Sequence, residues 1–354
     1  MQTKKNNKRF VITLIVLATI LVILFFTSMC LGRYPVSFGD VFKFFTFQQI
    51  EDTPHRVIEY LRLPRTLIAL LIGCSLAVSG AIYQSAFNNK LVSPDLLGVS
   101  SGASVGACLA ILIGLTSALI SVFAFIFGFA AVALTLLISK AFKNKSNIIL
   151  ILCGLAVGGL MSSLVGLMKY LADNEMKLAE MTFWLLGDLS KTTINDFWVI
   201  LPVAVIGCAV AIILSWRLNI ISLGAKESKA LGVNYKVTMI LLIFVATALT
   251  AVSVAIGGTI GWIGLVIPNI VRLFVGCNNK KVIPISILLG SIMMIIVDTL
   301  ARTIAPNEIP LSIITGILGT PLFIYAIFKR RREIQWALLK LRISLSDTIK
   351  QEKY

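Results

Sequence analysis

The chain has 354 residues, of which 58% are hydrophobic and only 14% are charged, and its formal net charge is +16. A soluble domain of this composition would lack the polar groups needed to cover its apolar surface. Apolar runs of about 20 residues recur, and each is long enough to cross the hydrocarbon of a bilayer. The composition therefore predicts a polytopic membrane protein. In such a protein the excess of Lys and Arg is explained by positively charged cytoplasmic loops and does not indicate nucleic-acid binding.

The apolar runs predict about ten transmembrane helices and hence an all-α fold. The runs fall at residues 11–31, 66–87, 96–115, 117–139, 148–168, 197–215, 237–256, 261–276, 283–301 and 311–328. The run at 261–276 is short and contains two glycines and a proline, which is typical of a broken helix. We therefore expect a basic N-terminus at 1–10, a membrane domain at 11–328 and a basic amphipathic tail at 329–354.

The distribution of charge predicts the orientation. Ten crossings place both ends of the chain on one side of the membrane. With the N-terminus inside, most of the 32 Lys and Arg residues fall in cytoplasmic segments and most of the 16 acids fall outside. This agrees with the positive-inside rule and predicts an N-in, C-in protein. Arg62, Arg65 and Arg302 then lie at the outer ends of the second and ninth helices.

Metal, redox and catalytic sites are not indicated. His55 is the only histidine, and the six cysteines lie in or at the ends of apolar runs without CxxC spacing. The cysteines are interpreted as small packing residues. The chain contains no Walker motif, nucleophile elbow or cluster of metal ligands. We therefore predict no catalytic residue, bound metal or cofactor in this chain.

Two patterns within the apolar runs predict helix packing. Gly98, Gly102 and Gly106 recur every four residues and are expected to form a stripe that lets another backbone approach, within the bundle or at a subunit interface. Asp298 and Arg302 are one turn apart, which predicts a buried ion pair. A proton-coupling role for Asp298 is the alternative, although no second buried acid accompanies it.

The cytoplasmic loop at 217–236 is too long to be a simple connection. Gly224 and Gly232 predict breaks between two short helices. A structured loop of about 20 residues is either a docking element for a partner or an ordinary surface loop. Its two Leu-Gly pairs, Leu223-Gly224 and Leu231-Gly232, are suited to presenting a compact knob.

Taken together, these residues resemble the FecCD, or vitamin B12-type, permeases of ABC importers for ferric siderophores, haem and cobalamin. The resemblance covers about residues 55 to 328. It is carried by "LRLPRTLIALLIGCSLAVSGAIYQ" (61–84), "PDLLGVSSGASVGA" (94–107), "WLLGDLS" (184–190), "SLGAKESKALGV" (222–233), "GTIGWIGLVIPNIVRLFVG" (258–276), "DTLAR" (298–302) and "EIPLSIITGILGTPLF" (308–323).

The resemblance implies a multi-pass permease of the bacterial cytoplasmic membrane that works with several partners. These are a second permease, identical or a sister chain, two ATPase subunits that hold ATP and Mg, and an external binding protein or lipoprotein. The chain is also expected to contact membrane lipid, and the resemblance implies no nucleic-acid partner. The expected function is to form the path for a ferric siderophore, with haem or cobalamin as alternatives.

The resemblance also implies roles for individual residues. Arg62, Arg65 and Arg302 match arginines that engage carboxylates of the binding protein, which suits the bidentate geometry of guanidinium groups. The positions expected to couple to the ATPase are Leu223, Gly224, Ala225, Leu231 and Gly232. Asn89 and Leu91 match a cytoplasmic gate, and Ser162 and Ser163 are expected to line the path.

Two positions depart from the family pattern. Asn89-Lys90-Leu91 stands where the family usually has Asn-Pro-Leu, and Pro268-Asn269 stands where it usually has Pro-His. Proteins of other classes would need features that this sequence lacks. An ion-coupled secondary transporter needs buried carboxylates or unwound ion sites, and only Asp298 qualifies. A membrane-embedded enzyme needs a catalytic cluster near one face.

Overall fold

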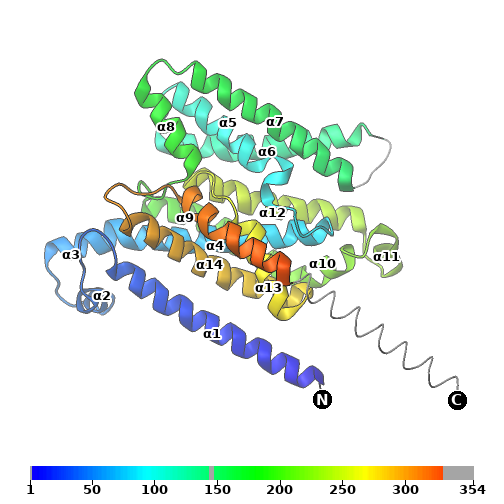
Figure 1. The fold of residues 1–354 in the computed structure, drawn as a ribbon, viewed down its shortest axis with the longest axis horizontal. Helices are drawn as coiled ribbons and strands as arrows, with labels where there is room; N and C mark the ends of the chain where they lie inside the picture. The colour runs from blue at the N-terminus through cyan, green and yellow to red at the C-terminus, as the bar shows by residue number, and fades with distance from the viewer. Residues whose placement is uncertain (1, 143–146, 330–354) are drawn as a thin grey trace.

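The computed structural model of the chain describes residues 2–142 and 147–329, and every regular element in these ranges is a helix. In chain order the elements are α1 (Gln2–Cys30), α2 (Phe38–Phe45), α3 (Asp52–Arg56), the π-helical turn η1 (Val57–Arg62), α4 (Leu63–Ala86), the 3-10 turn η2 (Pro94–Leu97), α5 (Val99–Leu112), α6 (Ser117–Lys140), α7 (Asn147–Tyr170), α8 (Glu175–Leu186), α9 (Ile194–Ile213), α10 (Ser215–Ile221), α11 (Ala225–Ala230), α12 (Tyr235–Gly257), α13 (Ile263–Val275), α14 (Asn279–Thr303) and a last helix, Leu311–Lys329 (Figure 1).

The predicted number of membrane helices is confirmed. Within the described ranges, eight helices are long and apolar enough to cross a membrane, and α5 and α13 are shorter apolar helices. These ten helices coincide with the ten apolar runs of the sequence. The tail predicted at 329–354 lies outside the described residues, apart from Lys329.

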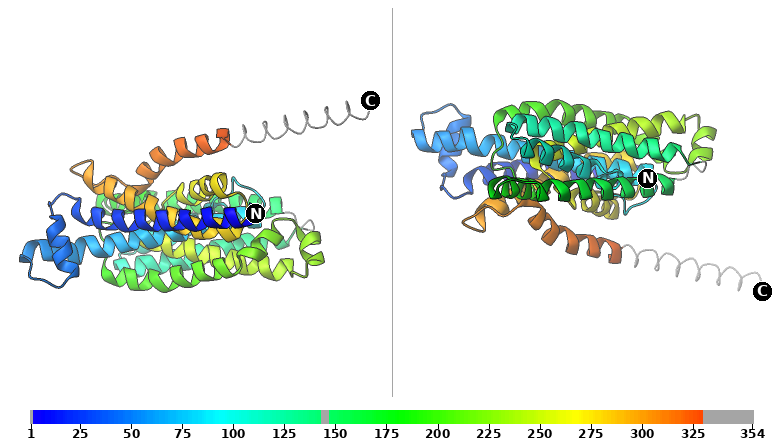
Figure 2. Two further views of the ribbon diagram at one scale, coloured as in Figure 1. Left: turned by 90° about the horizontal axis from the view of Figure 1, so that it is seen from below. Right: turned by 90° about the horizontal axis from the view of Figure 1, so that it is seen from above.

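The helices form a layered bundle around α4, nearly all of whose residues are buried. α4 packs against α14, α12, α13 and α9, while α5, α6 and α7 form a separate layer (Figure 1). α1 runs along the outside of the bundle, and the last helix diverges from it (Figure 2). The most apolar stretch of α1 has no buried residue, so its side chains are free to face lipid, whereas Ser28 and Met29 near the end of the helix are buried.

The two ends of the bundle carry different elements. The start of α1 lies at the same end as α10 and α11, whereas α2, α3 and α8 lie at the opposite end (Figure 1). This is the arrangement expected for an N-in protein with the 217–236 loop inside. We therefore refer to these ends as the inner and outer ends.

Close backbone contacts hold α4 in the centre of the bundle. A Cβ atom on Gly80 would overlap the carbonyl of Gly264 at the start of α13, and one on Gly73 would overlap the carbonyl of Gly290 in α14. Lipid tails are as apolar as the helices, so the hydrophobic effect does not drive helices together within a membrane. Small residues at a crossing allow close backbone packing, which stabilises the contact instead. Because these glycines have no side chains, α4 packs in direct backbone contact with both α13 and α14.

The predicted glycine stripe is partly wrong. Gly102 and Gly106 do face α6, where a Cβ atom would meet the backbone at Phe127 and Phe123. Gly98, however, precedes α5 with a φ of 83°, in the left-handed region that glycine tolerates best. It makes the turn from η2 into α5 rather than contributing to the packing stripe.

The predicted break near 261–276 lies before the helix and not inside it. α12 ends at Gly257, and the chain continues irregularly until α13 begins at Ile263. Pro268 lies within α13, which stays helical around it. Gly258 adopts a φ of 69° in the connection between α12 and α13, whereas Gly264 lies in the first turn of α13 and packs against Gly80.

We predict that replacing Gly80 by alanine lowers the melting temperature of the purified protein in detergent. The added Cβ would push α4 away from α13, and overpacking of this kind costs roughly 1–3 kcal/mol. Gly159→Ala is the matched control, because Gly159 lies in α7 with open space around its Cβ position. Its melting temperature should be unchanged or slightly higher, since alanine favours helix. Equal melting temperatures for the two variants would contradict the close approach.

Candidate functional sites

The three arginines predicted at the outer end do lie there, but they are buried. Arg62 ends η1, Arg65 lies in the first turn of α4, and Arg302 lies in the last turn of α14. Their exposed fractions are 4%, 7% and 5%. Buried guanidinium groups require partners within the protein. The three side chains are therefore defined first by their internal contacts.

Asp298 is the centre of this cluster. Its Oδ1 accepts a bond of 2.6 Å from Arg65 Nε, and its Oδ2 lies 3.5 Å from Arg302 Nε. Arg65 Nη1 also pairs with Glu308, at 2.9 Å from Oε2. The Asp298–Arg302 pair predicted from the sequence is present, but Arg65 is the nearer partner of Asp298. The chain separation of Arg65 and Asp298 gives no local sequence signal.

The other contacts of the arginines tie down the end of α1. Arg302 Nη2 donates to the carbonyl of Ser28 at 2.6 Å and to its hydroxyl at 2.5 Å. Arg62 donates to the carbonyls of Met29 and Tyr34. Carbonyls in the last turn of a helix lack intrahelical donors, and cations there interact favourably with the helix dipole. Both arginines therefore cap α1 and join it to the bundle.

These contacts bear on how the arginines could meet a partner. In this conformation Arg65 is engaged by two carboxylates, and the other two guanidinium groups are engaged by backbone carbonyls. An incoming carboxylate would need to displace one of these groups or to join the exposed rim of the cluster. Glu308 is the more accessible partner, with a side chain that is 29% exposed. The docking role of the arginines stays a prediction.

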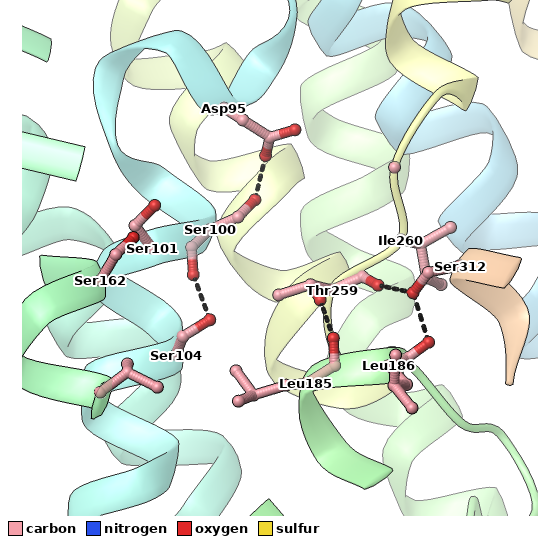
Figure 3. A pocket seen from close by; sticks show the side chains of 12 residues that line it. Asp95, Ser100, Ser101, Ser104, Ser162, Leu185, Leu186, Thr259, Ile260 and Ser312 are labelled. Carbon is pink, nitrogen blue, oxygen red and sulfur yellow. Dashed lines mark hydrogen bonds between the residues drawn. The ribbon is translucent and has the colours of Figure 1, made fainter. Parts of the chain in front are cut away.

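A polar cavity of about 470 Å³ lies between α5, α7 and the segment that precedes α13 (Figure 3). Its lining residues are Asp95, Ser100, Ser101, Ser104, Ser162, Val165, Leu185, Leu186, Thr259, Ile260, Gly261 and Ser312. They come from η2, α5, α7, the end of α8, the connection between α12 and α13, and the last helix. A hydroxyl-rich cavity inside an apolar bundle is suited to a hydrated or polar solute.

Hydrogen bonds order part of the cavity wall. The Ser100 hydroxyl donates to Asp95, and Ser104 Oγ donates to the carbonyl of Ser100 at 2.8 Å. On the opposite side, Ser312 Oγ donates to the carbonyls of Leu186 and Thr259 (Figure 3). The second of these bonds is 2.9 Å long. Together they join three separate segments at the outer side of the cavity.

The predicted lining pair Ser162 and Ser163 is divided. Ser162 lines the cavity, whereas Ser163 is not among the lining residues and donates to the carbonyl of Gly159 at 3.1 Å. Only the first of the two serines therefore contributes its hydroxyl to the cavity wall. The sequence analysis missed Asp95 and the serines of α5. Their signal was the spacing of Ser100, Ser101 and Ser104, which places hydroxyls on neighbouring faces of one helix.

The predicted gate residues lie in the exposed loop after α4. Asn89 Oδ1 accepts from the backbone N–H of Leu91 at 3.0 Å, and Leu91 is exposed. Asn269 Nδ2, in α13, donates to the carbonyl of Lys90 at 2.9 Å. The two positions that depart from the family pattern, Lys90 and Asn269, are therefore joined in space. The gate role of Asn89 and Leu91 stays a prediction.

The 217–236 loop has the predicted form of two short helices, α10 and α11. Gly224 and Gly232 separate them from their neighbours, with φ values of 115° and 74°. Ser228 is buried, and its hydroxyl donates to the carbonyl of Gly224 at 2.6 Å, which stiffens the turn. Leu223 and Leu231 are 59% and 57% exposed. Two apolar side chains are thus displayed on a structured knob at the inner end, with Ala225 exposed between them.

No group of three or more His, Cys, Asp or Glu side chains in the described residues is placed to hold a metal ion. The chemistry available at the sites above is ion pairing, hydroxyl solvation and apolar docking.

We predict that Asp298→Asn strongly destabilises the protein. The substitution leaves Arg65 and Arg302 buried beside a neutral amide, and breaking a buried pair in this way costs about 3–5 kcal/mol. The melting temperature in detergent should fall well below that of Glu180→Gln, which removes an exposed acid from α8. Glu308→Gln should lie between them, because the side chain of Glu308 is partly solvated. An Asp298→Asn variant as stable as Glu180→Gln would refute the central role of this carboxylate.

Comparison with known proteins identifies the family. Residues 20–329 match the FecCD transport family. The chain is 38% identical over 320 residues to the molybdate import system permease protein MolB of Haemophilus influenzae, covering 89% of this chain and 95% of that protein. It is 36% identical over 275 residues to a protein of Helicobacter pylori named "Probable iron chelatin transport system permease protein", covering 78% of this chain and 83% of that protein.

A solved inward-facing structure, assigned to an ABC transporter of metal-chelate type, superposes on the chain with a TM-score of 0.82. The two chains are 39% identical, and the match covers 89% of this chain and 98% of that chain. Family match, sequence identity and fold thus agree over most of the chain. The chain therefore belongs to the FecCD transport family and is a membrane permease of an ABC importer.

Proposed function

We propose that this permease forms the path for a metal chelate, of the ferric siderophore kind, across a bacterial cytoplasmic membrane. The observation that carries the proposal is the knob of α10 and α11, which displays Leu223 and Leu231 at the inner end of a bundle without an ATP-binding motif of its own. A protein of this kind depends on a separate ATPase. ATP and Mg are then held by that partner and not by this chain.

The size and lining of the cavity support a chelate as the substrate. A volume of about 470 Å³ is in the range of sites for small organic ligands and is large for a bare tetraoxo anion. Relatives are named for molybdate and for iron chelatin. Molybdate is therefore the second candidate substrate, and haem and cobalamin are the alternatives within the family.

The mechanism that we propose is alternating access. A loaded binding protein docks at the outer end, and closure of the ATPase pair moves the α10–α11 knob. The bundle transmits this motion as a rigid body because its centre is fixed by backbone contacts between α4 and its neighbours. Substrate then passes inward by the loop that contains Asn89 and Leu91.

The cavity also supports a second permease as a partner. α5, α7 and the last helix line it from one side of this chain, and α7 exposes several apolar side chains, among them Leu152, Leu155 and Leu160. A second permease, identical or a sister chain, would complete the wall of the path. An ion-coupled secondary transporter would need neither this partner nor an ATPase.

We expect that replacing both Leu223 and Leu231 by aspartate reduces the amount of ATPase that co-purifies with this chain by tenfold or more. Charged side chains cannot enter the apolar pocket that such a knob requires. The matched control replaces both residues by methionine, which keeps the surface apolar and should retain the ATPase. Melting temperature checks that the fold is intact.

Two outcomes of this experiment would count against the proposal. If the aspartate variant still retained the ATPase, the knob would not be the docking element. If the unchanged chain purified alone and carried out uptake alone, the ABC mechanism itself would be wrong.

We further propose that Arg62, Arg65 and Arg302 attract the acidic surface of the binding protein. Because Glu308 competes for Arg65, Glu308→Gln should strengthen docking, and Arg65→Gln should weaken it about tenfold. Affinity of the binding protein for the permease, measured at low and high salt, reads this out. Glu59→Gln removes a nearby outer acid and controls for general repulsion. Equal effects of Glu308→Gln and Glu59→Gln would contradict competition at Arg65.

A further inference from the structure

We propose that the polar cavity is a charge-selective transit site, in which Asp95 favours neutral or positively charged chelates and rejects free oxyanions. The proposal rests on the proposed function, because it takes the cavity to be part of the translocation path. It goes further by naming the sign of charge that the path accepts and the residue that sets it.

The first argument is the inventory of the cavity wall. Among the twelve described residues that line it, the polar side chains are one carboxylate and six hydroxyls. None of these lining residues is Lys, Arg or His. Asp95 therefore supplies the only charged side chain in the described lining. A solute in the cavity meets a negative charge without a compensating positive charge in the wall.

The second argument is the placement of Asp95. It lies in η2, the short turn that precedes α5, and its side chain is exposed to the cavity. The Ser100 hydroxyl donates to one of its oxygens and orients the carboxyl group in the cavity wall (Figure 3). The other oxygen accepts no hydrogen bond from a described residue and is free to meet a solute. Its field is felt strongly because the surrounding helices are apolar.

The third argument comes from the hydroxyls of Ser101 and Ser162. They lie on α5 and α7, on the same side of the cavity (Figure 3). No hydrogen bond to another described residue is recorded for either hydroxyl. A hydroxyl can donate or accept, so it can solvate either the oxygens of a chelate or its cationic groups. The hydroxyls thus bind polar solutes of either sign, and the carboxylate decides between them.

The proposal separates the two substrates suggested by the relatives. A free molybdate ion would approach a carboxylate of its own sign, whereas a neutral or cationic ferric hydroxamate would not be repelled. Like charges at close range repel each other, and the apolar helices around the cavity screen this repulsion less than bulk water does. The cavity is accordingly built for metal that arrives inside an organic ligand.

The test measures the electrostatic potential in the cavity directly. Ser162→Cys is introduced into the full chain, with the exposed Cys277 replaced by serine. Modification rates are then measured with positively charged, negatively charged and neutral methanethiosulfonate reagents, and each rate is divided by that of a small thiol in solution. We expect the positive reagent to react about tenfold faster than the negative one after this correction.

The matched variants decide whether Asp95 is the cause. Asp95→Asn should bring the two corrected rates to within about twofold of each other. Glu180→Gln, which removes one negative charge from the exposed face of α8, should leave the tenfold ratio in place. A ratio that is unaffected by Asp95→Asn would overturn the proposal. So would a cysteine that no reagent reaches, because a transit site must be open to water.

A second measurement uses the assembled transporter and a series of chelates that differ only in charge. Ferrioxamine B is positively charged, its acetylated form is neutral and its succinylated form is negative. Uptake should fall in that order, and Asp95→Asn should reduce the difference. The thiol measurement needs neither the ATPase nor the binding protein. The thiol measurement therefore tests the charge selectivity of the cavity by itself. Its result is independent of whether the proposed importer function is correct.

Discussion

The outer half of this protein depends on one carboxylate held away from water. Asp298 lies between the guanidinium groups of Arg65 and Arg302, and each arginine reaches on to another segment. Through Arg302 the carboxylate is connected to Ser28 at the end of α1, and through Arg65 to Glu308 before the last helix. A buried charge can be kept only if all its partners stay in place. Segments from both ends of the chain are thus joined at one point.

This constraint gives the outer arginines a structural role in addition to their predicted role in docking. A row of exposed arginines would be a simple electrostatic landing site. Here the same residues also hold α1, α4 and α14 together. A partner that competes for one guanidinium group would therefore act on the packing of three helices as well as on its own affinity. Docking at these arginines would then be linked to helix movement through shared hydrogen bonds.

The sequence predicted the membrane helices well because length and apolarity determine them directly. It also predicted the Asp298–Arg302 pair, since residues one turn apart share a helix face. It could not indicate the pairing of Arg65 with Asp298, which depends on how α4 packs on α14. Gly98 was misjudged because spacing alone does not distinguish a packing glycine from one in a left-handed turn.

The cavity was the feature least accessible to sequence analysis. Its wall is assembled from six separate segments, and its only charged lining residue, among those described, lies in a four-residue turn. Neither periodicity nor hydropathy marks such a residue. Ser162 lies in the cavity wall and its neighbour Ser163 does not, and their role in a translocation path stays a prediction. Only the arrangement of α5, α7 and the last helix brings these groups together.

The contact between Asn269 and Lys90 determines how firmly the loop after α4 is held. The proline usual in this loop would restrict its backbone, and the lysine here removes that restriction. The amide of Asn269 supplies a different restraint by holding the carbonyl of Lys90. A neutral hydrogen bond contributes only about 0.5–1.5 kcal/mol, so thermal motion breaks and remakes it readily. The loop after α4 is therefore held at this point by a hydrogen bond that can open and re-form, and not by a fixed backbone dihedral angle.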